Sequence, residues 1–496
     1  MDKTSNSTPS LRKNYLYRVF YEVLILITPF ITTPYVSRIL GADGVGVYSY
    51  THSYITYFML FGALGTAGYG AREIARARDD RSRSSKLFWE IELMTVFTSG
   101  ICLIAWAAFI LFNVKYRMYY IALTPFLLST MFDISWYFTG YEKVKNIVIR
   151  NSAVRIIGIV LLFALVKEKD DLILYCVINS VTALLGNMSM WLYMPKMLEK
   201  IDFKTLEFKH HFHETLIYFI PTIAISIYTV LDKTLIGMIT GNEYQSGYYE
   251  QATKIINLVK SVVFVAVNSV MGARISYLFA GEKYDEIKKR IARAMDFIYL
   301  LAWGAVFGIV GVAARFVPMF FGKGYDEVIT LLYLMVPLVL IIGTSHCLGS
   351  LYYTPSGQRK RSAKIIVLGA CINLCLNLIL IPRFQSYGAT TASIIAELTI
   401  TVIYIQMSAG YMTWKQILKY SWKRAVAGMI MLVFIGYLGT LLSATGDVVA
   451  VATLIISGAA CYGIVLLLLR DSMLRELINT GLKMMRKIYG KITGAN

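Results

Sequence analysis

Apolar residues occur along the chain in long blocks that are separated by short polar connections. Each block holds roughly 20 residues, enough at 1.5 Å of helix rise per residue to cross a hydrocarbon layer of about 30 Å. A soluble helical protein would show narrow apolar stripes instead. The pattern predicts about fourteen membrane-spanning helices. They cover residues 15–38, 45–69, 87–112, 118–140, 146–166, 171–194, 213–239, 247–275, 293–316, 328–353, 363–382, 389–409, 424–443 and 448–469.

Composition strengthens this interpretation. The 496 residues have a mean hydropathy of +0.58 and are 57% hydrophobic and 16% charged, whereas about a quarter of a soluble protein's residues are charged. The short alternating segments of a membrane β-barrel do not occur in the sequence. The fold class is therefore predicted to be an all-α polytopic membrane protein.

The net charge of +19 arises mostly from lysine and arginine in every second connection. The positive-inside rule then places both termini and the long connections in the cytoplasm. We interpret the basic excess as a topology signal and a contact with anionic lipid head groups, which excludes a nucleic-acid partner. The first apolar block follows "MDKTSNSTPSLRK" and has no cleavage pattern, so it is predicted to be a retained span.

Three short patterns recur in the same order about 200 residues apart. "GADGVGVYSY" from Gly41 matches "GNEYQSGYYE" from Gly241, with an acidic residue at the third place and tyrosine at the eighth. "GAR" occurs at Gly70 and again at Gly272. "PFLLSTMFDISWYFTGYEK" and "PLVLIIGTSHCLGSLYYTPSGQRK" each begin at a proline within a span and end in two aromatic residues, threonine and a basic turn. These echoes predict two six-helix lobes related by a parallel pseudo-two-fold repeat.

The predicted organisation has five parts. They are an N-terminal lobe over 1–195, a cytoplasmic linker over 196–212, a C-terminal lobe over 213–409, an appended helix pair over 410–470 and a basic amphipathic tail over 471–496. The tail is predicted to lie on the inner membrane surface. Two lobes that meet near the membrane midplane are typical of transporters that alternate access by rocking.

Ionisable residues are concentrated in the seventh and eighth predicted spans. They are Asp232, Lys233, Glu250, Lys254, Lys260 and Arg274. A charge at the bilayer centre costs about 3 kcal/mol, so such side chains face protein or water. Glu250, Lys254, Asn257, Ser261 and Asn268 share one helix face and predict a wall of a water-filled cavity. The alternative is an internal Glu250–Lys254 ion pair with snorkelling side chains at the helix ends.

The sequence therefore predicts a cationic cavity that binds an anionic cargo. Its candidate cargo-binding residues are Lys233, Lys254, Lys260, Arg274, Arg38, Arg72, Arg155, Tyr48, Tyr248 and Asn257. The candidates for ion coupling or charge balance are Asp232, Glu250, Asp133, Glu22 and Glu397. At Arg72 and Arg274, anchoring at the membrane interface is an alternative to cargo binding. At Glu22, the alternative to ion coupling is an ion pair with Arg18 near the end of the first span.

No catalytic residues and no metal site are predicted, and no cofactor is expected beyond a coupling Na⁺ or H⁺. The histidine-rich stretch "KHHFHET" lacks carboxylate or cysteine partners at ligand spacing. We expect it to be a solvated connection before the seventh span.

At "TTPYVSRILGADGVGVYSY", "YFTGYEK" and "YYTPSGQRK" the sequence resembles the Wzx-type polysaccharide flippases of the multidrug/oligosaccharidyl-lipid/polysaccharide exporter superfamily. The resemblance covers essentially the whole chain. It implies a protein of the bacterial cytoplasmic membrane that moves a polyprenyl-diphosphate-linked oligosaccharide from the inner to the outer leaflet. It also implies polysaccharide polymerase or assembly proteins as partners.

Three other functions remain open. A lipid II flippase fits every feature above. A drug/cation antiporter fits less well, because its cavity should be acidic and spans seven and eight are mainly basic. A membrane glycosyltransferase or polymerase would present catalytic groups on a large outer loop, and the longest outer connection, "FVPMFFGKGYDE", has no paired acidic site. No nucleotide-binding loop that would indicate an ATP-driven pump occurs in the sequence.

Overall fold

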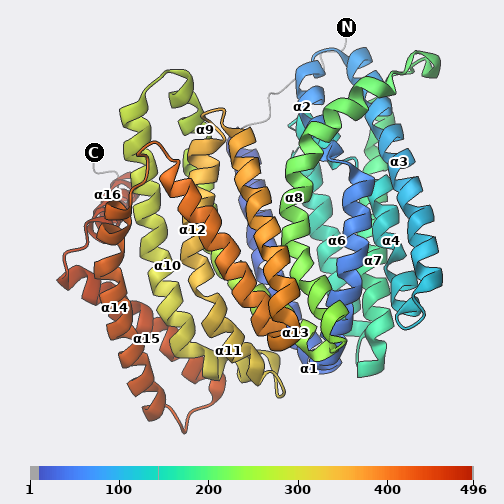
Figure 1. Cartoon of the computed structure of the whole chain (residues 1–496). Coiled ribbons are helices and arrows are strands. Elements are labelled where there is room, and N and C mark those ends of the chain that lie inside the picture. Colours follow the sequence, from blue (N-terminus) through green and yellow to red (C-terminus); the bar gives the residue numbers. More distant parts are fainter. Residues whose placement is uncertain (1–10, 143, 494–496) are drawn as a thin grey trace. The chain divides into compact units, whose positions relative to one another are not determined.

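The computed structural model describes residues 11–142 and 144–493, which form helices and no strands (Figure 1). The predicted all-α class is confirmed. The chain divides into two compact units, Met1–Gly247 and Tyr248–Asn496, and each is described by itself.

The helices of the first unit run in chain order from α1 to α8, with three short 3₁₀ turns. They are α1 (Leu11–Ala63), α2 (Thr66–Ala77), α3 (Arg81–Phe112), α4 (Arg117–Met131), α5 (Ser135–Gly140), α6 (Val144–Leu165), η1 (Lys169–Asp171), α7 (Leu172–Ser189), η2 (Met190–Lys196), η3 (Phe203–Thr205) and α8 (Phe208–Thr240). Helix α9 (Glu243–Ala280) begins in this unit and continues in the second. The second unit adds α10 (Tyr284–Phe321), α11 (Asp326–Met335), α12 (Pro337–Leu348), η4 (Gly349–Tyr353), α13 (Arg359–Gln406), α14 (Trp414–Leu441), α15 (Asp447–Leu468) and α16 (Ser472–Thr493).

The predicted spans lie mostly within these helices, although 45–69 crosses the break between α1 and α2, and 118–140 crosses that between α4 and α5. Within the described residues, nine helices are long and apolar enough to cross a membrane, or ten if α11 and the following helix, bent by 41°, form one span. Helices α1 and α13 each contain one whole predicted span and most of the next, separated by a break at Gly41 (φ 69°, ψ 174°) and at Gln385 (φ 52°, ψ −127°). The total of about fourteen spans stays a prediction, and so does the pseudo-two-fold repeat.

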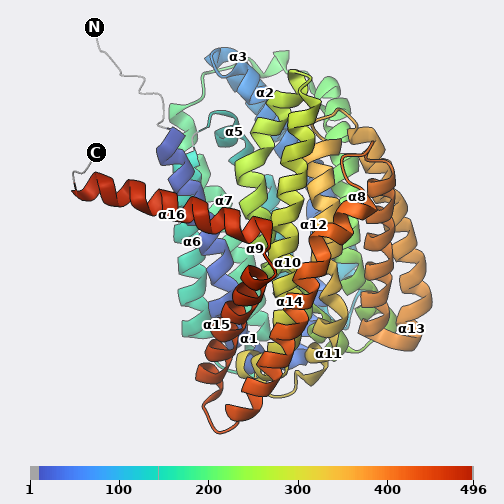
Figure 2. The ribbon, with the colours of Figure 1, turned by 90° about the vertical axis from the view of Figure 1, so that its left-hand side faces the viewer.

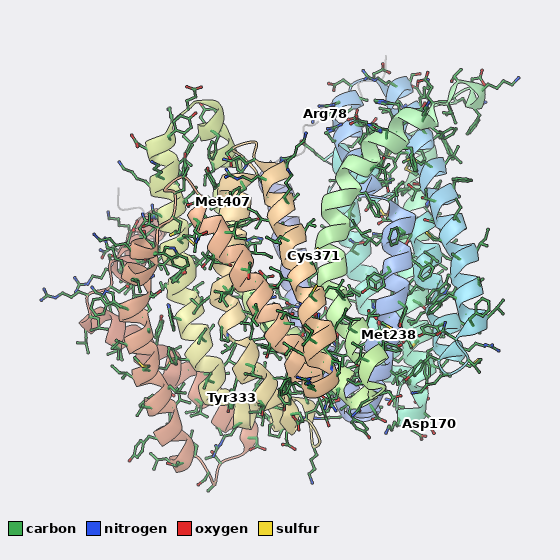
Figure 3. All side chains as sticks on the ribbon, viewed as in Figure 1. Arg78, Asp170, Met238, Tyr333, Cys371 and Met407 are labelled. Atoms are coloured by element: carbon green, nitrogen blue, oxygen red, sulfur yellow. The ribbon has the colours of Figure 1, made fainter. Side chains whose placement is uncertain are left out.

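The alternation of sides along the chain is visible within each unit. In Figure 3 Arg78, from the connection after α2, and Asp170, from the connection before α7, lie at opposite ends of the first unit. In the second unit Met407 and Tyr333 are separated in the same way. This arrangement agrees with basic and non-basic connections on opposite sides.

The two glycines of the first sequence echo both occupy the left-handed region, Gly41 at φ 69° and Gly241 at φ 60°. In each case the acidic residue two places later forms an ion pair with a lysine from another connection. Lys169 Nζ lies 2.6 Å from Asp43, and Lys115 Nζ lies 2.9 Å from Glu243. Both turns thus combine a glycine of positive φ with an ion-paired carboxylate, but their backbones differ, with ψ 174° at Gly41 and ψ 10° at Gly241.

The carboxylate of Glu243, which precedes its predicted span, is expected to make stability depend on pH. Partial burial raises its pKa, but hydrogen bonds donated by Lys115 and Tyr116 outweigh burial and hold the pKa below its ordinary value of 4.5. The folded state thus favours the ionised form, so this stabilisation is present above pH 4.5 and is lost as the pH falls through the folded-state pKa.

Replacing Glu243 with glutamine should therefore lower the denaturation midpoint at neutral pH, and the loss should shrink as the pH falls through the folded-state pKa, because the wild-type carboxylate then becomes protonated as well. Denaturant titrations in detergent across this pH range measure the difference. An equal loss at every pH would show that the ion pair plays no part.

In the second unit, α10, α14 and α15 pack against one another, and the C-terminal helix α16 follows them. Figure 2 shows α16 running at a steep angle to α14 and α15. This orientation is the one that an amphipathic helix on a membrane surface requires, and the surface location stays a prediction. The outer faces of α14 and α15 expose large apolar side chains such as Val433 and Ile456, as expected for contact with lipid.

Helix α8, which the sequence analysis assigns to the second lobe, packs in the structure against α1, α2 and α3. Tyr57 on α1 and Thr234 on α8 are hydrogen-bonded at 3.1 Å, and Thr234 also donates to Ser53 at 2.8 Å. The compact first unit therefore extends to Gly247.

Candidate functional site

Three predicted cargo-binding arginines lie on different helices of the first unit. Arg72 on α2 contacts Glu73 at 2.8 Å and Glu214 at 3.7 Å, and its guanidinium lies over the ring of Tyr69. Two carboxylates thus already balance its charge, which favours the anchoring interpretation. Arg38 on α1 is exposed.

Arg155 on α6 is half-buried within a membrane-spanning helix, and the structure gives it no hydrogen bond or ion pair among the described residues. A charge within a membrane span is costly unless a ligand, a protein group or water solvates it, so Arg155 stays a candidate for cargo binding.

Two further candidates of the first unit have local structural roles. Asp133 lies in the break between α4 and α5, where its carboxylate accepts a hydrogen bond from the backbone N–H of Ser135 at 3.0 Å. Tyr48 on α1 packs with its ring 4.8 Å from Tyr175 and 5.3 Å from His52. Asp133 thus stabilises a local turn, and Tyr48 joins α1 to α7, so neither arrangement requires a cargo.

The adjacent pair Asp232 and Lys233 lies on α8. Asp232 is buried, with 5% of its surface exposed, whereas Lys233 is half-buried. Successive helical side chains point about 100° apart, so the two groups have different surroundings. Tyr57 of α1 is near enough to Asp232 to interact with it electrostatically.

The described members of the predicted polar stripe on α9 have different surroundings, and a cavity wall stays a prediction. Lys254 Nζ lies 3.4 Å from Glu250, one helical turn away, and Glu250 is 8% exposed. Asn257 is exposed, and its carbonyl accepts from Ser261 at 2.8 Å. The ring of Tyr248 lies 6.3 Å from that of Tyr325. The alternative of an internal ion pair is thus realised at Glu250 and Lys254.

Lys260 differs from Lys254 because no described carboxylate pairs with it directly. It is half-buried on α9, and Glu397 of α13 is the acidic residue near enough to interact with it electrostatically. The structure gives Lys260 no hydrogen bond among the described residues. A lysine in this position can bind an anion without first breaking an ion pair.

Two candidates cannot be placed. The structure does not describe the side chains of Glu22 and Arg274, nor those of Arg18 and Pro221. Their predicted roles stay predictions.

The histidine-rich stretch is helical, with His210 and His213 exposed, and the expectation of a solvated connection is wrong for His211. This residue lies in the first turns of α8 and is 6% exposed. Its Nε2 donates to Glu90 Oε2 at 2.9 Å, and its Nδ1 is hydrogen-bonded to Tyr69 at 2.7 Å. Sequence spacing alone could not find this network, because Glu90 is 121 residues away. Among the described residues, no group of three or more His, Cys, Asp or Glu could hold a metal ion.

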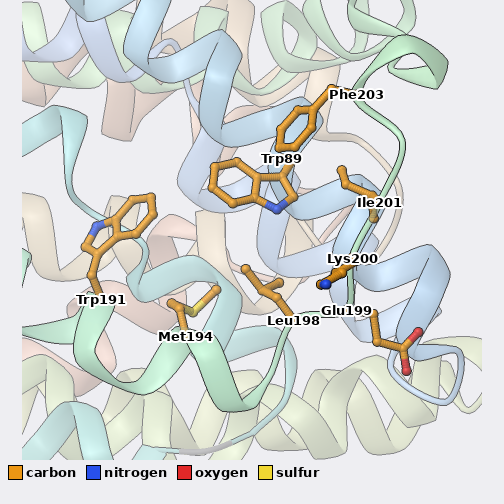
Figure 4. A pocket seen from close by; sticks show the side chains of 8 residues that line it. All are labelled: Trp89, Trp191, Met194, Leu198, Glu199, Lys200, Ile201 and Phe203. Atoms are coloured by element: carbon orange, nitrogen blue, oxygen red, sulfur yellow. The ribbon is translucent and has the colours of Figure 1, made fainter.

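A cavity of about 610 Å³ lies beside the connection between η2 and α8 (Figure 4). Trp89, Trp191 and Phe203 form aromatic walls, and Glu199 and Lys200 add opposite charges. None of the predicted site residues lines it.

Comparisons with known proteins complete the description. The family model described as "Polysaccharide biosynthesis protein" matches residues 11–276. A curated Escherichia coli (strain K12) protein described as "Putative O-antigen transporter" is 23% identical over 403 residues, which cover 80% of this chain and 96% of that protein. A Shigella dysenteriae protein of the same description is 22% identical, with 80% and 99% covered.

Two solved structures share the fold. The inward closed conformation of the lipid II flippase MurJ superposes with a TM-score of 0.66 at 17% identity, covering 92% of this chain and 99% of that chain. An outward-facing multidrug resistance transporter of the MATE family, in the MOP superfamily, gives a TM-score of 0.51 at 12% identity, with 85% and 96% covered. These similarities show the fold, and both neighbours are transporters.

Proposed function

Because the chain belongs to the polysaccharide biosynthesis protein family, we propose that it is a flippase for a lipid-linked oligosaccharide. The observation that carries the proposal is the similarity, over 80% of the chain, to a curated O-antigen transporter, combined with a fold shared with a lipid II flippase. The chain is then a transporter rather than an enzyme. Its cargo is a polyprenyl-diphosphate-linked repeat unit of a polysaccharide.

The finer parts of the proposal are direction, cavity chemistry and energy source. The cargo moves from the cytoplasmic to the outer leaflet of a bacterial cytoplasmic membrane by alternating access, with both termini of the chain in the cytoplasm. The basic connections of the predicted cytoplasmic side support this topology. A proton or sodium gradient drives the movement, and polysaccharide polymerase or assembly proteins receive the product.

Translocation in liposomes that contain only this protein tests the proposal. The cargo is a fluorescent polyprenyl-diphosphate oligosaccharide, and an impermeant quencher reports the leaflet in which it resides. We expect cargo to cross faster than in protein-free liposomes, and faster still under a proton or sodium gradient. Movement of lipid II alone would favour the lipid II flippase, and uptake of an organic cation with no lipid movement would favour the antiporter.

Lys260 is the cation that we expect to contribute most to diphosphate binding. Charge-assisted hydrogen bonds contribute about 1.5–3 kcal/mol, so Lys260→Ala should lower the translocation rate at limiting cargo by about tenfold or more. Lys254→Ala should have a smaller effect, since Lys254 is already paired with Glu250.

Two controls accompany this prediction. Lys260→Arg keeps the charge and should retain most of the activity. Lys360→Ala removes an exposed lysine from the first turn of α13 and should leave transport unchanged. Equal rates for Lys260→Ala and the wild-type protein, at matched protein content, would contradict a role for this charge.

A further inference from the structure

Two glutamates two residues apart on α3 have opposite surroundings. Glu90 is 3% exposed and is hydrogen-bonded to His211 and to the backbone N–H of Glu207, with Lys86 at 3.7 Å. Glu92 is 1% exposed, and neither of its carboxyl oxygens has a hydrogen-bond partner. Glu92 belongs to none of the candidate sets above.

The buried surroundings of Glu92 combine aromatic rings with small hydroxyl side chains. It shares the buried face of α3 with Ser85, Phe88, Thr95 and Ser99. Trp136 of α5 stacks on Phe88 at 5.7 Å and approaches Glu92, yet its indole N–H is also buried without a hydrogen bond. The charged group that faces Glu92 is Asp133, from the break between α4 and α5.

The remaining nearby charges are engaged elsewhere. Lys86 and Glu90 of α3 contact each other, and His211 of α8 contacts Glu90. No described cation is therefore paired with Glu92. An unpaired carboxylate in such a site would be strongly destabilised by burial, and the neighbouring Asp133 would add repulsion. A carboxylic acid that retains its proton avoids both costs.

Trp136 supplies a second state for the same carboxyl group. A carboxylate at Glu92 could accept the unused indole N–H, which would draw α5 toward α3. The indole also lies directly on α2, because a Cβ at Gly70 would approach Trp136 Cε3 to 2.4 Å. Loss or gain of the proton at Glu92 would thus shift α5 relative to α3 and change the packing of Trp136 on α2.

We propose that Glu92 is a proton-binding site of the transport cycle, protonated in the described conformation and hydrogen-bonded to Trp136 after the proton has left to water. The proposal rests on the proposed function and adds a coupling ion and its residue. Glu92 lies five residues inside the predicted start of its span at 87, about 8 Å along the helix, which is close enough for exchange with the cytoplasmic side.

The transport test compares the wild-type protein with Glu92→Gln, which mimics the protonated acid. In the liposome assay a proton gradient should accelerate cargo movement by the wild-type protein by about tenfold, and Glu92→Gln should lose this acceleration. Glu92→Asp should retain part of it, and Glu286→Gln, at an exposed ion pair with Arg290, should behave as the wild-type protein. Full acceleration in Glu92→Gln, or acceleration by sodium alone, would overturn the proposal.

A cargo-independent test separates failure of this inference from failure of the proposed function. The wild-type protein in liposomes is treated with dicyclohexylcarbodiimide, which reacts with protonated carboxyl groups in apolar sites, and the adducts are located by peptide mass spectrometry. We expect labelling of Glu92 that decreases at alkaline pH, and none of Glu90. Absence of a Glu92 adduct across the pH range would overturn the proton site even if cargo moves, and labelling without any cargo movement would overturn the proposed function alone.

Discussion

Replacing Arg424 with methionine is expected to lower the free energy of unfolding by about 3–5 kcal/mol, the usual cost of removing one partner from a buried ion pair. Arg424 on α14 is 1% exposed. Its guanidinium lies 2.6 Å from Asp296 on α10 and 3.2 Å from Asp471, which precedes α16. It also donates to the backbone carbonyl of Asp296 at 2.7 Å.

The size of this effect comes from the two carboxylates that remain. Asp471 is 5% exposed, and it also accepts from the backbone N–H of Leu474, so the triad fixes the start of α16 as well as the packing of α10 on α14. Without Arg424 the two aspartates repel each other in a site of low polarity. Chemical denaturation of the purified protein in detergent measures the change.

Two variants distinguish this cause from a simple loss of packing. Changing Asp296 and Asp471 to asparagine together with Arg424→Met should recover most of the lost stability, because no buried charge then remains. Arg315→Met removes an arginine from α10 that donates only to the carbonyls of Leu442 and Gly439, and should cost about 1–2 kcal/mol. A triple variant as unstable as Arg424→Met would refute the electrostatic explanation.

The positions of the helices could be predicted from the sequence, whereas the burial of Arg424 could not. The helices follow the apolar blocks closely, as at α3 and α15, because the thickness of a membrane dictates both length and composition. The break at Gly41 likewise falls between two predicted spans. These are local properties of the chain.

Burial of polar groups was not predictable in the same way. Arg424 begins a predicted span and looks like an ordinary cytoplasmic anchor, yet its partner Asp296 is 128 residues away. His211 looks like part of a solvated polar stretch, and Glu92 looks like one of two similar glutamates. Only tertiary packing separates Glu90, with its three partners, from Glu92, with none.

Replacing Gly46 with valine is expected to lower the free energy of unfolding by about 3 kcal/mol, because it forces a side chain against a backbone. A Cβ at Gly46 on α1 would lie 1.8 Å from the carbonyl oxygen of Glu243. Reciprocally, a Cβ at Gly247 would lie 1.9 Å from the carbonyl oxygen of Ala42. The two glycines thus let α1 and the start of α9 approach to backbone contact, as small residues do between membrane helices.

Denaturation midpoints of Gly46→Val and Gly463→Val in detergent test this contact. Gly463 on α15 has nothing within 4 Å of the position of a Cβ, so its substitution should be nearly neutral and controls for the change of residue type. Separation of the two turns should also break the ion pair between Lys115 and Glu243. The stabilisation that Glu243 gives above pH 4.5 should therefore be absent in Gly46→Val, and equal midpoints for the two glycine variants would show that the close approach is not a feature of the folded protein.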